Sequence, residues 1–262
     1  RTFLDENGGK DIEIIAKIEN LSGVENVDSI CEIAHGIMVA RGDLGVEIPF
    51  VKVPTVQKFL IERCQHLGKR VITATEMLES MIYNPRPTRA EISDVANAVY
   101  DGSSAIMLSG ETASGQHPVE AVKTMSDIAM YTEEHIDYES KFRSAVYSMA
   151  NKVDALSHAT CAIAFDSNAK AIVINSLSGI TVKMVSRFKP QADILGTTIN
   201  EKVYRQLNLC WGVKPLLTEE YNSMDVIFYE SLKDAKRNFD LKPGDTIVVT
   251  GGQTNGKTGN SN

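Results

Sequence analysis

Cysteine is scarce in this sequence, and its few copies are far apart. The 262 residues contain four cysteines with no C-x-x-C pair among them, at Cys31, Cys64, Cys161 and Cys210. This spacing argues against a disulfide framework or a thiolate metal site and favours reduced thiols. Long apolar runs are missing too, since none approaches the roughly 20 residues of a membrane span and no signal-like segment precedes the first predicted strand. We therefore expect a cytoplasmic protein that does not enter a membrane.

Positive charge is the next deficit. Lys and Arg number 27 against 34 Asp and Glu, which gives a net charge of −7 and a pI near 5.3. The basic residues are scattered rather than gathered, so no nucleic-acid partner is expected. Low-complexity sequence is confined to residues 251–262, and 43% of the chain is apolar. That composition supplies a core for one large or two ordinary globular domains.

Four short apolar runs in the first half each end in a polar segment. The segments are AKIEN at 16–20, ARGDLG at 40–45, TATEMLES at 73–80 and LSGETA at 108–113. They recur about once per 30 residues, the length of one strand and one helix. In a parallel β/α barrel the carboxyl ends of successive strands surround one mouth, where catalytic side chains lie. The recurrence therefore predicts strand–helix units whose polar segments converge.

The apolar pattern predicts that residues 1–136 form half of a (β/α)8 TIM-type barrel. A capping box from Thr88 to Glu91 starts one helix, and the other elements are expected as strands at 12–18, 37–40, 70–74 and 105–108 and helices at 21–34, 53–67 and 118–132.

The recurrence of apolar runs that end in polar segments stops near 135–147, where charged and aromatic residues replace it. We place a domain boundary there. Residues 137–262 are expected to form an open, mostly parallel α/β sheet, with strands at 171–175, 193–197, 213–217 and 246–250 and helices at 157–165, 181–188, 200–208 and 223–238.

Two carboxylates follow neighbouring predicted strands, Glu19 in the first polar segment and Asp43 in the second. Paired oxygen ligands of this kind hold Mg²⁺ or Mn²⁺, although either residue alone is better explained as a solvated acid. Lys17 lies two residues before Glu19, so both side chains point to one side of an extended strand. A fixed cation beside a metal suits a phosphoryl group in transfer, and the alternative is a salt bridge to a neighbouring acid.

The second and third polar segments offer groups for binding a small anion. Gly42 and Gly45 flank Asp43 and Leu44 in a tight turn that exposes backbone N–H groups, and such a turn ahead of a short helix binds carboxylates. Thr75 offers a hydroxyl for relaying a proton to a substrate carbon or oxygen. The alternative for Thr75 is a hydrogen bond to nearby backbone.

In this order, the motifs of the first half resemble those of the pyruvate kinase family. The matching stretches are K-I-E-N, A-R-G-D-L-G, A-T-x-M-L-E-S, P-R-P-T-R-A-E-x-x-D-V-A-N-A-V-x-D-G and L-S-G-E-T-A. The resemblance extends over the whole chain, because 176–179 (SLSG), 211–213 (WGV) and 256–259 (GKTG) are similar to that family's C-terminal regulatory domain. Glu76 departs from the family pattern, since many members carry Gln there.

The resemblance implies phosphoryl transfer from phosphoenolpyruvate to ADP, giving pyruvate and ATP, with Mg²⁺ (or Mn²⁺) and K⁺ as cofactors. Lys17 matches the lysine that stabilises the transferring phosphoryl group, and Glu19 and Asp43 match the divalent-metal ligands. Thr75 matches the threonine beside the enolate. The backbone of Gly42 and Asp43 matches the segment that holds the pyruvate carboxylate.

The resemblance also implies a homotetramer with a regulatory site. Arg89 resembles an interface arginine that braces the Arg41–Gly42 turn of a neighbouring subunit. A Ser/Gly-rich turn ahead of a predicted helix resembles the cradle for the phosphate of an allosteric effector, and it suits phosphate on physical grounds too, with a plain helix N-cap as the alternative. The residues of this turn are Ser176, Ser178, Gly179 and Thr181.

A second phosphate-binding pattern, G-x-x-x-x-G-K-T at 251–258, follows a predicted strand as a P-loop does. A P-loop also opens a helix, and residues 259–262 (GNSN) do not favour one, so we expect a turn instead.

The family's first four barrel strands, its K⁺ ligands and its nucleotide-covering domain have no match in this chain. We therefore expect a piece of a longer protein that is inactive alone. Two other interpretations remain open. One is a non-catalytic regulatory and oligomerising module, and the other is an enolate-forming lyase or aldolase that would share Glu19 and Asp43 without needing Lys17.

Overall fold

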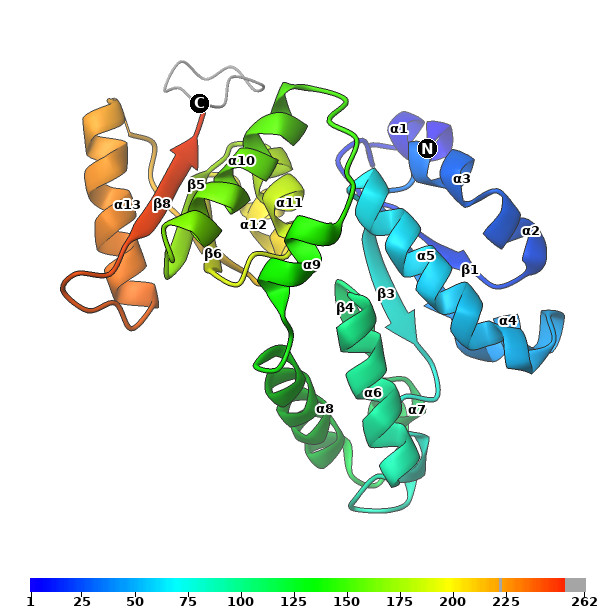
Figure 1. Ribbon diagram of the computed structural model, residues 1–262. Coiled ribbons are helices and arrows are strands. Elements are labelled where there is room, and N and C mark those ends of the chain that lie inside the picture. Colours follow the sequence, from blue (N-terminus) through cyan, green and yellow to red (C-terminus); the bar gives the residue numbers. More distant parts are fainter. Residues whose placement is uncertain (222, 253–262) are drawn as a thin grey trace. The chain divides into compact units, whose positions relative to one another are not determined.

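The computed structural model describes residues 1–221 and 223–252. By its internal contacts the chain divides into two compact units, Arg1–Ile136 and Asp137–Asn262 (Figure 1). Most of the P-loop-like segment at 251–258, and all of 256–259, lie outside the described residues.

The first unit contains a parallel sheet whose strands follow chain order, β1-β2-β3-β4. Its strands are β1 Ile15–Ile18, β2 Gly36–Ala40, β3 Arg70–Ala74 and β4 Ala105–Met107. Ile18 pairs with Val39, and Val39 pairs with Thr73 on the next strand. The carboxyl ends of the strands therefore lie along one edge of the sheet. These parallel strand–helix units confirm the predicted fold class, as a partial barrel.

Helices connect the strands of the first unit. They are α1 Thr2–Glu6, α2 Leu21–Glu25, α3 Val27–Ile33, α4 Arg41–Glu47, α5 Val53–Leu67, α6 Arg89–Asp101, α7 Gly110–Ala113 and α8 Pro118–Glu133, with short 3₁₀ turns η1 Phe50–Lys52 and η2 Glu79–Ile82. Of these helices, α4, α5 and α6 contact the sheet. The capping box at the start of α6 is present, with the Thr88 side chain accepting from Glu91 N–H and the Glu91 side chain accepting from Thr88 N–H.

Two predicted elements near the N-terminus were wrong in extent. The strand expected at 12–18 begins at Ile15, because the Ile14 backbone pairs with His35, whose ring Nδ1 accepts from Ile14 N–H at 3.0 Å. The helix expected at 21–34 is broken at Asn26, which ends α2 and begins α3. Its amide donates to the Ser22 carbonyl at 2.8 Å, a local bond that competes with a continuous helix.

Apolar side chains from helices and strands fix the position of the polar segments. Ile37 and Val39 of β2 are fully buried in a cluster with Leu60, Ile61 and Cys64 of α5. A second cluster joins the TATEMLES segment to helices α6 and α8. Its buried members are Met77, Leu78, Met81, Val95, Ala98, Ala121 and Met125.

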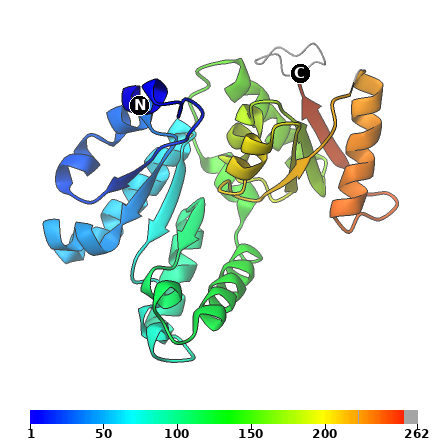
Figure 2. The ribbon, with the colours of Figure 1, turned by 180° about the vertical axis from the view of Figure 1, so that it is seen from behind.

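The second unit is an open parallel sheet in the order β7-β6-β5-β8. Its elements are α9 Tyr138–Ser144, α10 Lys152–Asp166, β5 Ala171–Asn175, α11 Ile180–Ser186, β6 Asp193–Thr198, α12 Glu201–Leu207, β7 Val213–Leu217, α13 Met224–Asn238 and β8 Ile247–Gly251. Residues alternate along β5: Ile172 and Ile174 pack with the cluster of α10, α11 and α12, whereas Val173 packs with Ala235 of α13. Helix α13 lies beside β8 in both views (Figures 1 and 2).

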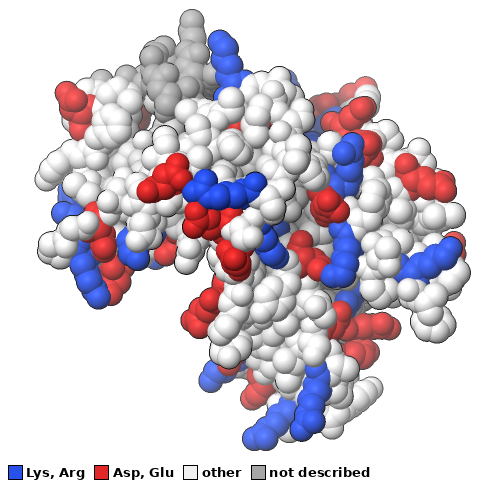
Figure 3. All heavy atoms as spheres, in the orientation of Figure 1, with Lys and Arg blue, Asp and Glu red and all other residues white. Residues whose placement is uncertain are grey.

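The surface carries both signs of charge. On the face seen in Figure 3, Lys and Arg side chains alternate with Asp and Glu. Over the described part of the chain, no helix combines the length and apolarity that crossing a bilayer requires.

Candidate active site

Three of the predicted site residues meet at the carboxyl ends of β1 and β2. Lys17 is in β1 and Glu19 directly follows it, while Asp43 lies in the first turn of α4, the helix that follows β2. The Lys17 ammonium forms an ion pair with the Glu19 carboxylate, and its Nζ lies 3.8 Å from Asp43 Oδ2. Two carboxylates therefore share one cation.

This cluster is open to water, with side-chain exposures of 54% for Lys17, 37% for Glu19 and 62% for Asp43. The hydrogen bond to Glu19 raises the pKa of Lys17, and the same bond lowers the pKa of Glu19. The salt bridge that was the alternative interpretation of Lys17 is thus formed. Its acidic partners are Glu19 and Asp43, the two predicted metal ligands.

The donor set suits a hard divalent cation. Carboxylate oxygens are what Mg²⁺ and Mn²⁺ prefer, and one or two protein carboxylates with substrate and water oxygens make a typical Mg²⁺ site. Among residues 1–221 and 223–252, no group of three or more His, Cys, Asp or Glu side chains is arranged to hold a metal. A site at Glu19 and Asp43 would therefore need oxygen ligands besides these two carboxylates.

Thr75 follows β3 and contacts the turn that follows β2. Its Oγ1 accepts from Gly42 N–H at 2.8 Å and donates to the Ala74 carbonyl at 2.6 Å. These are backbone bonds of the kind expected under the alternative interpretation of Thr75, and they also fix the direction of its hydroxyl. The structure thus brings Thr75 to the Gly42 turn, next to Asp43.

The backbone at Thr75 is unusual. Thr75 and Glu76 have φ values of 69° and 53°, in the left-handed region that favours glycine. Non-glycine residues in that region cost on the order of 1–3 kcal/mol each, and such costs cluster at functional sites.

The glycines of α4 are not required by packing. A Cβ on Gly42 would meet the Thr75 side chain at 3.6 to 3.9 Å, and one on Gly45 would meet Val53 at 3.8 Å, both ordinary contact distances. Neither has a positive φ, and glycine within a helix costs roughly 0.5–1 kcal/mol relative to alanine. The fold would accept alanine at both positions.

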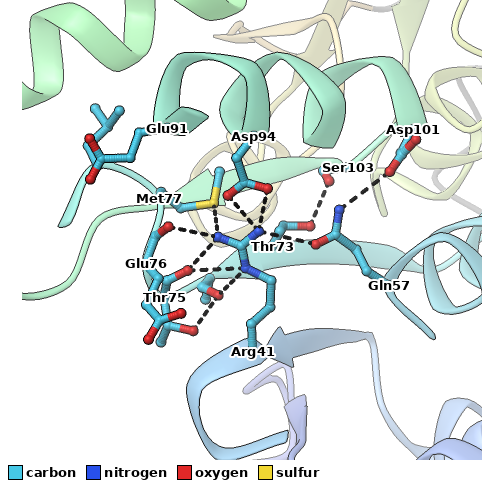
Figure 4. A network of polar contacts seen from close by, with 12 residues as sticks. Arg41, Gln57, Thr73, Thr75, Glu76, Met77, Glu91, Asp94, Asp101 and Ser103 are labelled. Atoms are coloured by element: carbon cyan, nitrogen blue, oxygen red, sulfur yellow. Dashed lines mark hydrogen bonds and ion pairs between the residues drawn. The ribbon is translucent and has the colours of Figure 1, made fainter. Parts of the chain in front are cut away.

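Arg41 is the centre of the polar contacts between these segments, and sequence reasoning assigned its side chain no role. Its guanidinium lies between the 74–77 backbone and helix α6 (Figure 4). It donates to the carbonyls of Ala74, Thr75 and Glu76 and to the Met77 sulfur, and it forms an ion pair with Asp94 at 2.7 Å. The signal in the sequence was a charged residue directly after a buried strand.

Two further carboxylates hold the polar segments in place. Glu91 accepts from Ser80 N–H and Oγ at 2.7 and 2.6 Å, and hydrogen bonds from Ser80 and Thr88 outweigh burial and lower the pKa of Glu91. Glu111, in the LSGETA segment, is only 1% exposed and accepts from Leu78 N–H and Ser109 N–H. The fourth segment thus contributes a buried acceptor.

Arg89, the predicted interface residue, is exposed at the start of α6. The neighbouring subunit that the resemblance implied for it is not part of this single chain, so its role stays a prediction.

The predicted effector turn lies between β5 and α11. Ser176 Oγ accepts from Gly179 N–H at 3.0 Å, and Ser178 Oγ accepts from Ile180 N–H at 3.5 Å. Gly179 has φ 72° and precedes α11 as its N-cap residue. Thr181 is 4% exposed, so its side chain packs inside the unit. Both serine hydroxyls therefore act as local caps in this structure.

Strand–helix units with polar side chains at the carboxyl ends of parallel strands define the class of β/α-barrel proteins. Comparison of the chain with known protein families identifies the family. The family model "Pyruvate kinase, barrel domain" matches residues 1–122, and "Pyruvate kinase, alpha/beta domain" matches residues 154–262. The chain belongs to the pyruvate kinase family.

Individual relatives agree over the full length of this chain. It is 46% identical to a pyruvate kinase of Clostridium acetobutylicum, covering 100% of this chain and 56% of the relative, and 48% identical to one of Geobacillus stearothermophilus, covering 45% of the relative. A crystal structure of a pyruvate kinase from Cryptosporidium parvum matches with a TM-score of 0.89 and 42% identity, over 94% of this chain and 51% of that one. The chain spans about half the length of the curated relatives it matches.

Proposed function

We propose that this chain is the second half of the barrel and the C-terminal domain of a pyruvate kinase, which moves a phosphoryl group from phosphoenolpyruvate to ADP. The observation that carries the proposal is the convergence of Lys17, Glu19 and Asp43 at neighbouring strand ends, in a chain of this family. The full-length enzyme would contain this chain together with the part that its relatives have and this chain lacks.

Glu19 and Asp43 would hold Mg²⁺ or Mn²⁺, as their shared contact with one cation supports. Such an ion would supply positive charge next to the oxygens of the substrate. Lys17 supplies a second fixed positive charge for the equatorial oxygens of the moving phosphoryl group. A lysine ammonium is protonated at neutral pH without any shift.

The turn after β2 would orient the substrate carboxylate. N–H groups at the start of a helix lack partners within the helix, and those of Gly42 and Asp43 lie in the first turn of α4. Gly42 N–H donates to Thr75 Oγ1 in this structure, so it would have to exchange that bond for one to the substrate carboxylate. The Thr75 hydroxyl, which contacts this turn, would relay a proton to the methylene carbon of the substrate. That carbon becomes the methyl group of pyruvate.

The wider properties of the enzyme belong to the same proposal. They are a K⁺ requirement with ligands outside this chain, a cytoplasmic homotetramer with Arg89 at a subunit interface, and an effector phosphate near Ser176, Ser178, Gly179 and Thr181. The division between domains is proposed at residue 136, where the internal contacts also divide the chain.

The test is the substitution Lys17→Met in the full-length enzyme. Turnover should fall by orders of magnitude while pyruvate still binds, because the lost ammonium acts on the moving phosphoryl group. Lys58→Met is the matched control, since Lys58 is a surface lysine of α5 paired with Asp101. Full turnover in Lys17→Met would reject the assignment.

A second test uses the 262-residue chain alone. A four-strand partial barrel should show no turnover, whereas measurable phosphoryl transfer by this chain would contradict the proposal that the remaining half is needed.

A further inference from the structure

The feature that requires explanation is the strained backbone that carries Thr75. Thr75 and Glu76 are consecutive left-handed residues, and neither is glycine. A β-branched residue such as threonine is a clear outlier there. Contacts from outside the segment must therefore hold this conformation, and the position of the Thr75 hydroxyl depends on them.

The Arg41 guanidinium makes those contacts. Its Nε and Nη2 donate to the Thr75 carbonyl at 3.1 and 2.5 Å, and Nη2 donates to the Glu76 carbonyl at 3.2 Å. A guanidinium presents five donors in a rigid plane and accepts nothing, so it suits a row of carbonyls that a left-handed turn directs to one side. Figure 4 shows this side of the turn facing Arg41.

Asp94 fixes the other edge of the guanidinium. Its two carboxylate oxygens lie 2.8 and 2.7 Å from Arg41 Nη1. The Arg41 side chain is 10% exposed, so a carboxylate partner limits the cost of placing its charge there. Asp94 lies in α6, whose apolar face packs on Met77, Leu78 and Met81. The carboxylate is therefore anchored to a rigid element.

We propose that Asp94 is a positioning residue for the reaction: through Arg41 it holds the 75–76 turn, and thereby the Thr75 hydroxyl, in the geometry that catalysis needs. This inference rests on the proposed function. Asp94 stands in the motif that resembles the family, yet nothing in the sequence pattern alone distinguishes this role from that of an exposed helix residue.

The proposal predicts which kinetic constant changes. Asp94→Asn keeps the size of the side chain but removes the charge that orients Arg41. The contacts among Lys17, Glu19 and Asp43 do not include Asp94. We expect kcat of the full-length enzyme to fall about 10- to 100-fold, as for a misplaced catalytic group, with KM for phosphoenolpyruvate and Mn²⁺ affinity changed less than about 3-fold.

A double-mutant cycle separates positioning from a general structural role. If Asp94 acts through the Thr75 hydroxyl, Asp94→Asn should cost nothing further in a Thr75→Ala background. If the two losses multiply instead, Asp94 acts independently of Thr75 and the proposal is overturned.

Two variants complete the test. Asp28→Asn is the matched control, because Asp28 forms a two-bond ion pair with Arg63 at 2.5 and 2.7 Å, and its kcat should equal that of the parent. If Asp94→Asn does not fold, Asp94→Glu replaces it in the test. Asp94→Glu keeps the carboxylate charge, whereas Arg41→Lys loses the planar set of donors. The kcat of Asp94→Glu should therefore lie nearer the parent value than the kcat of Arg41→Lys. Equal kcat in parent, Asp94 and Arg41 variants would refute the proposal, whereas a parent without pyruvate kinase turnover would refute the proposed function itself.

Discussion

Gly42 offers a test in which stability and activity should move in opposite directions. It lies in α4 with helical backbone, and a Cβ built there meets no atom closer than 3.6 Å. Gly42→Ala should therefore stabilise the first unit by about 0.5–1 kcal/mol, the ordinary difference between glycine and alanine in a helix. That change raises the melting temperature by about 1–4 °C.

Activity should fall, because the atoms nearest to the new methyl are those of the Thr75 side chain. The methyl would lie beside the hydroxyl that we propose for proton transfer and beside the N–H groups proposed for the carboxylate. The methyl fits against Thr75 without displacing it, so the loss would come from the space that it takes from the substrate. We expect kcat/KM for phosphoenolpyruvate to fall at least about 10-fold, because a substrate misplaced by about 1 Å can lose about 100-fold.

Gly45→Ala is the matched control, since it adds the same methyl to the same helix, but next to Val53. It should give the same gain in stability without a loss of turnover. The reasoning is refuted if Gly42→Ala melts below the parent, or if it keeps parental kcat/KM.

Three further predictions concern stability. Glu111→Ala leaves one buried and one half-buried backbone donor without their acceptor and should lower the free energy of unfolding by about 2–4 kcal/mol in urea titrations, with a loss below about 1 kcal/mol contradicting its role. Asp154→Ala leaves the buried Arg187 charge without its ion-pair partner at 3.3 Å and should cost about 3–5 kcal/mol, whereas Asp166→Ala, in an exposed pair, should cost less than about 1 kcal/mol. The pKa of Glu91 is lower in the folded state than in the unfolded state. Its contribution to the free energy of unfolding is therefore present above the ordinary glutamate pKa and is lost as the pH falls through the pKa of the folded state. The parent should therefore lose more stability than Glu91→Gln over that acidic range, and parallel curves would contradict this account.

Local patterns in the sequence located most of the fold. The strands at 70–74, 171–175 and 213–217 have the predicted bounds. The break at Asn26 was missed, since its apolar neighbours keep a helical spacing. Asn26 itself leaves the helical backbone, with φ −104° and ψ 18°, and its amide donates to the Ser22 carbonyl.

The candidate site was predictable as a set of residues but not as a set of contacts. The regular recurrence of apolar runs and polar segments locates the strand ends in the sequence. The residues at these ends include Lys17, Glu19 and Asp43. The role of Arg41 depends on Asp94, which is 53 residues away and reaches it only because α6 packs on the TATEMLES segment. Such a partner is determined by tertiary packing, and no local pattern contains it.

The central claim is that Glu19 and Asp43 hold one divalent ion beside Lys17. The most direct test is Mn²⁺ binding to the full-length enzyme, followed by electron paramagnetic resonance in the presence of pyruvate, for the parent and for Glu19→Gln, Asp43→Asn and the control Asp28→Asn. We expect each of the first two variants to weaken Mn²⁺ binding at least about 10-fold and the control to bind as the parent does. Parental Mn²⁺ affinity in both Glu19→Gln and Asp43→Asn would contradict it.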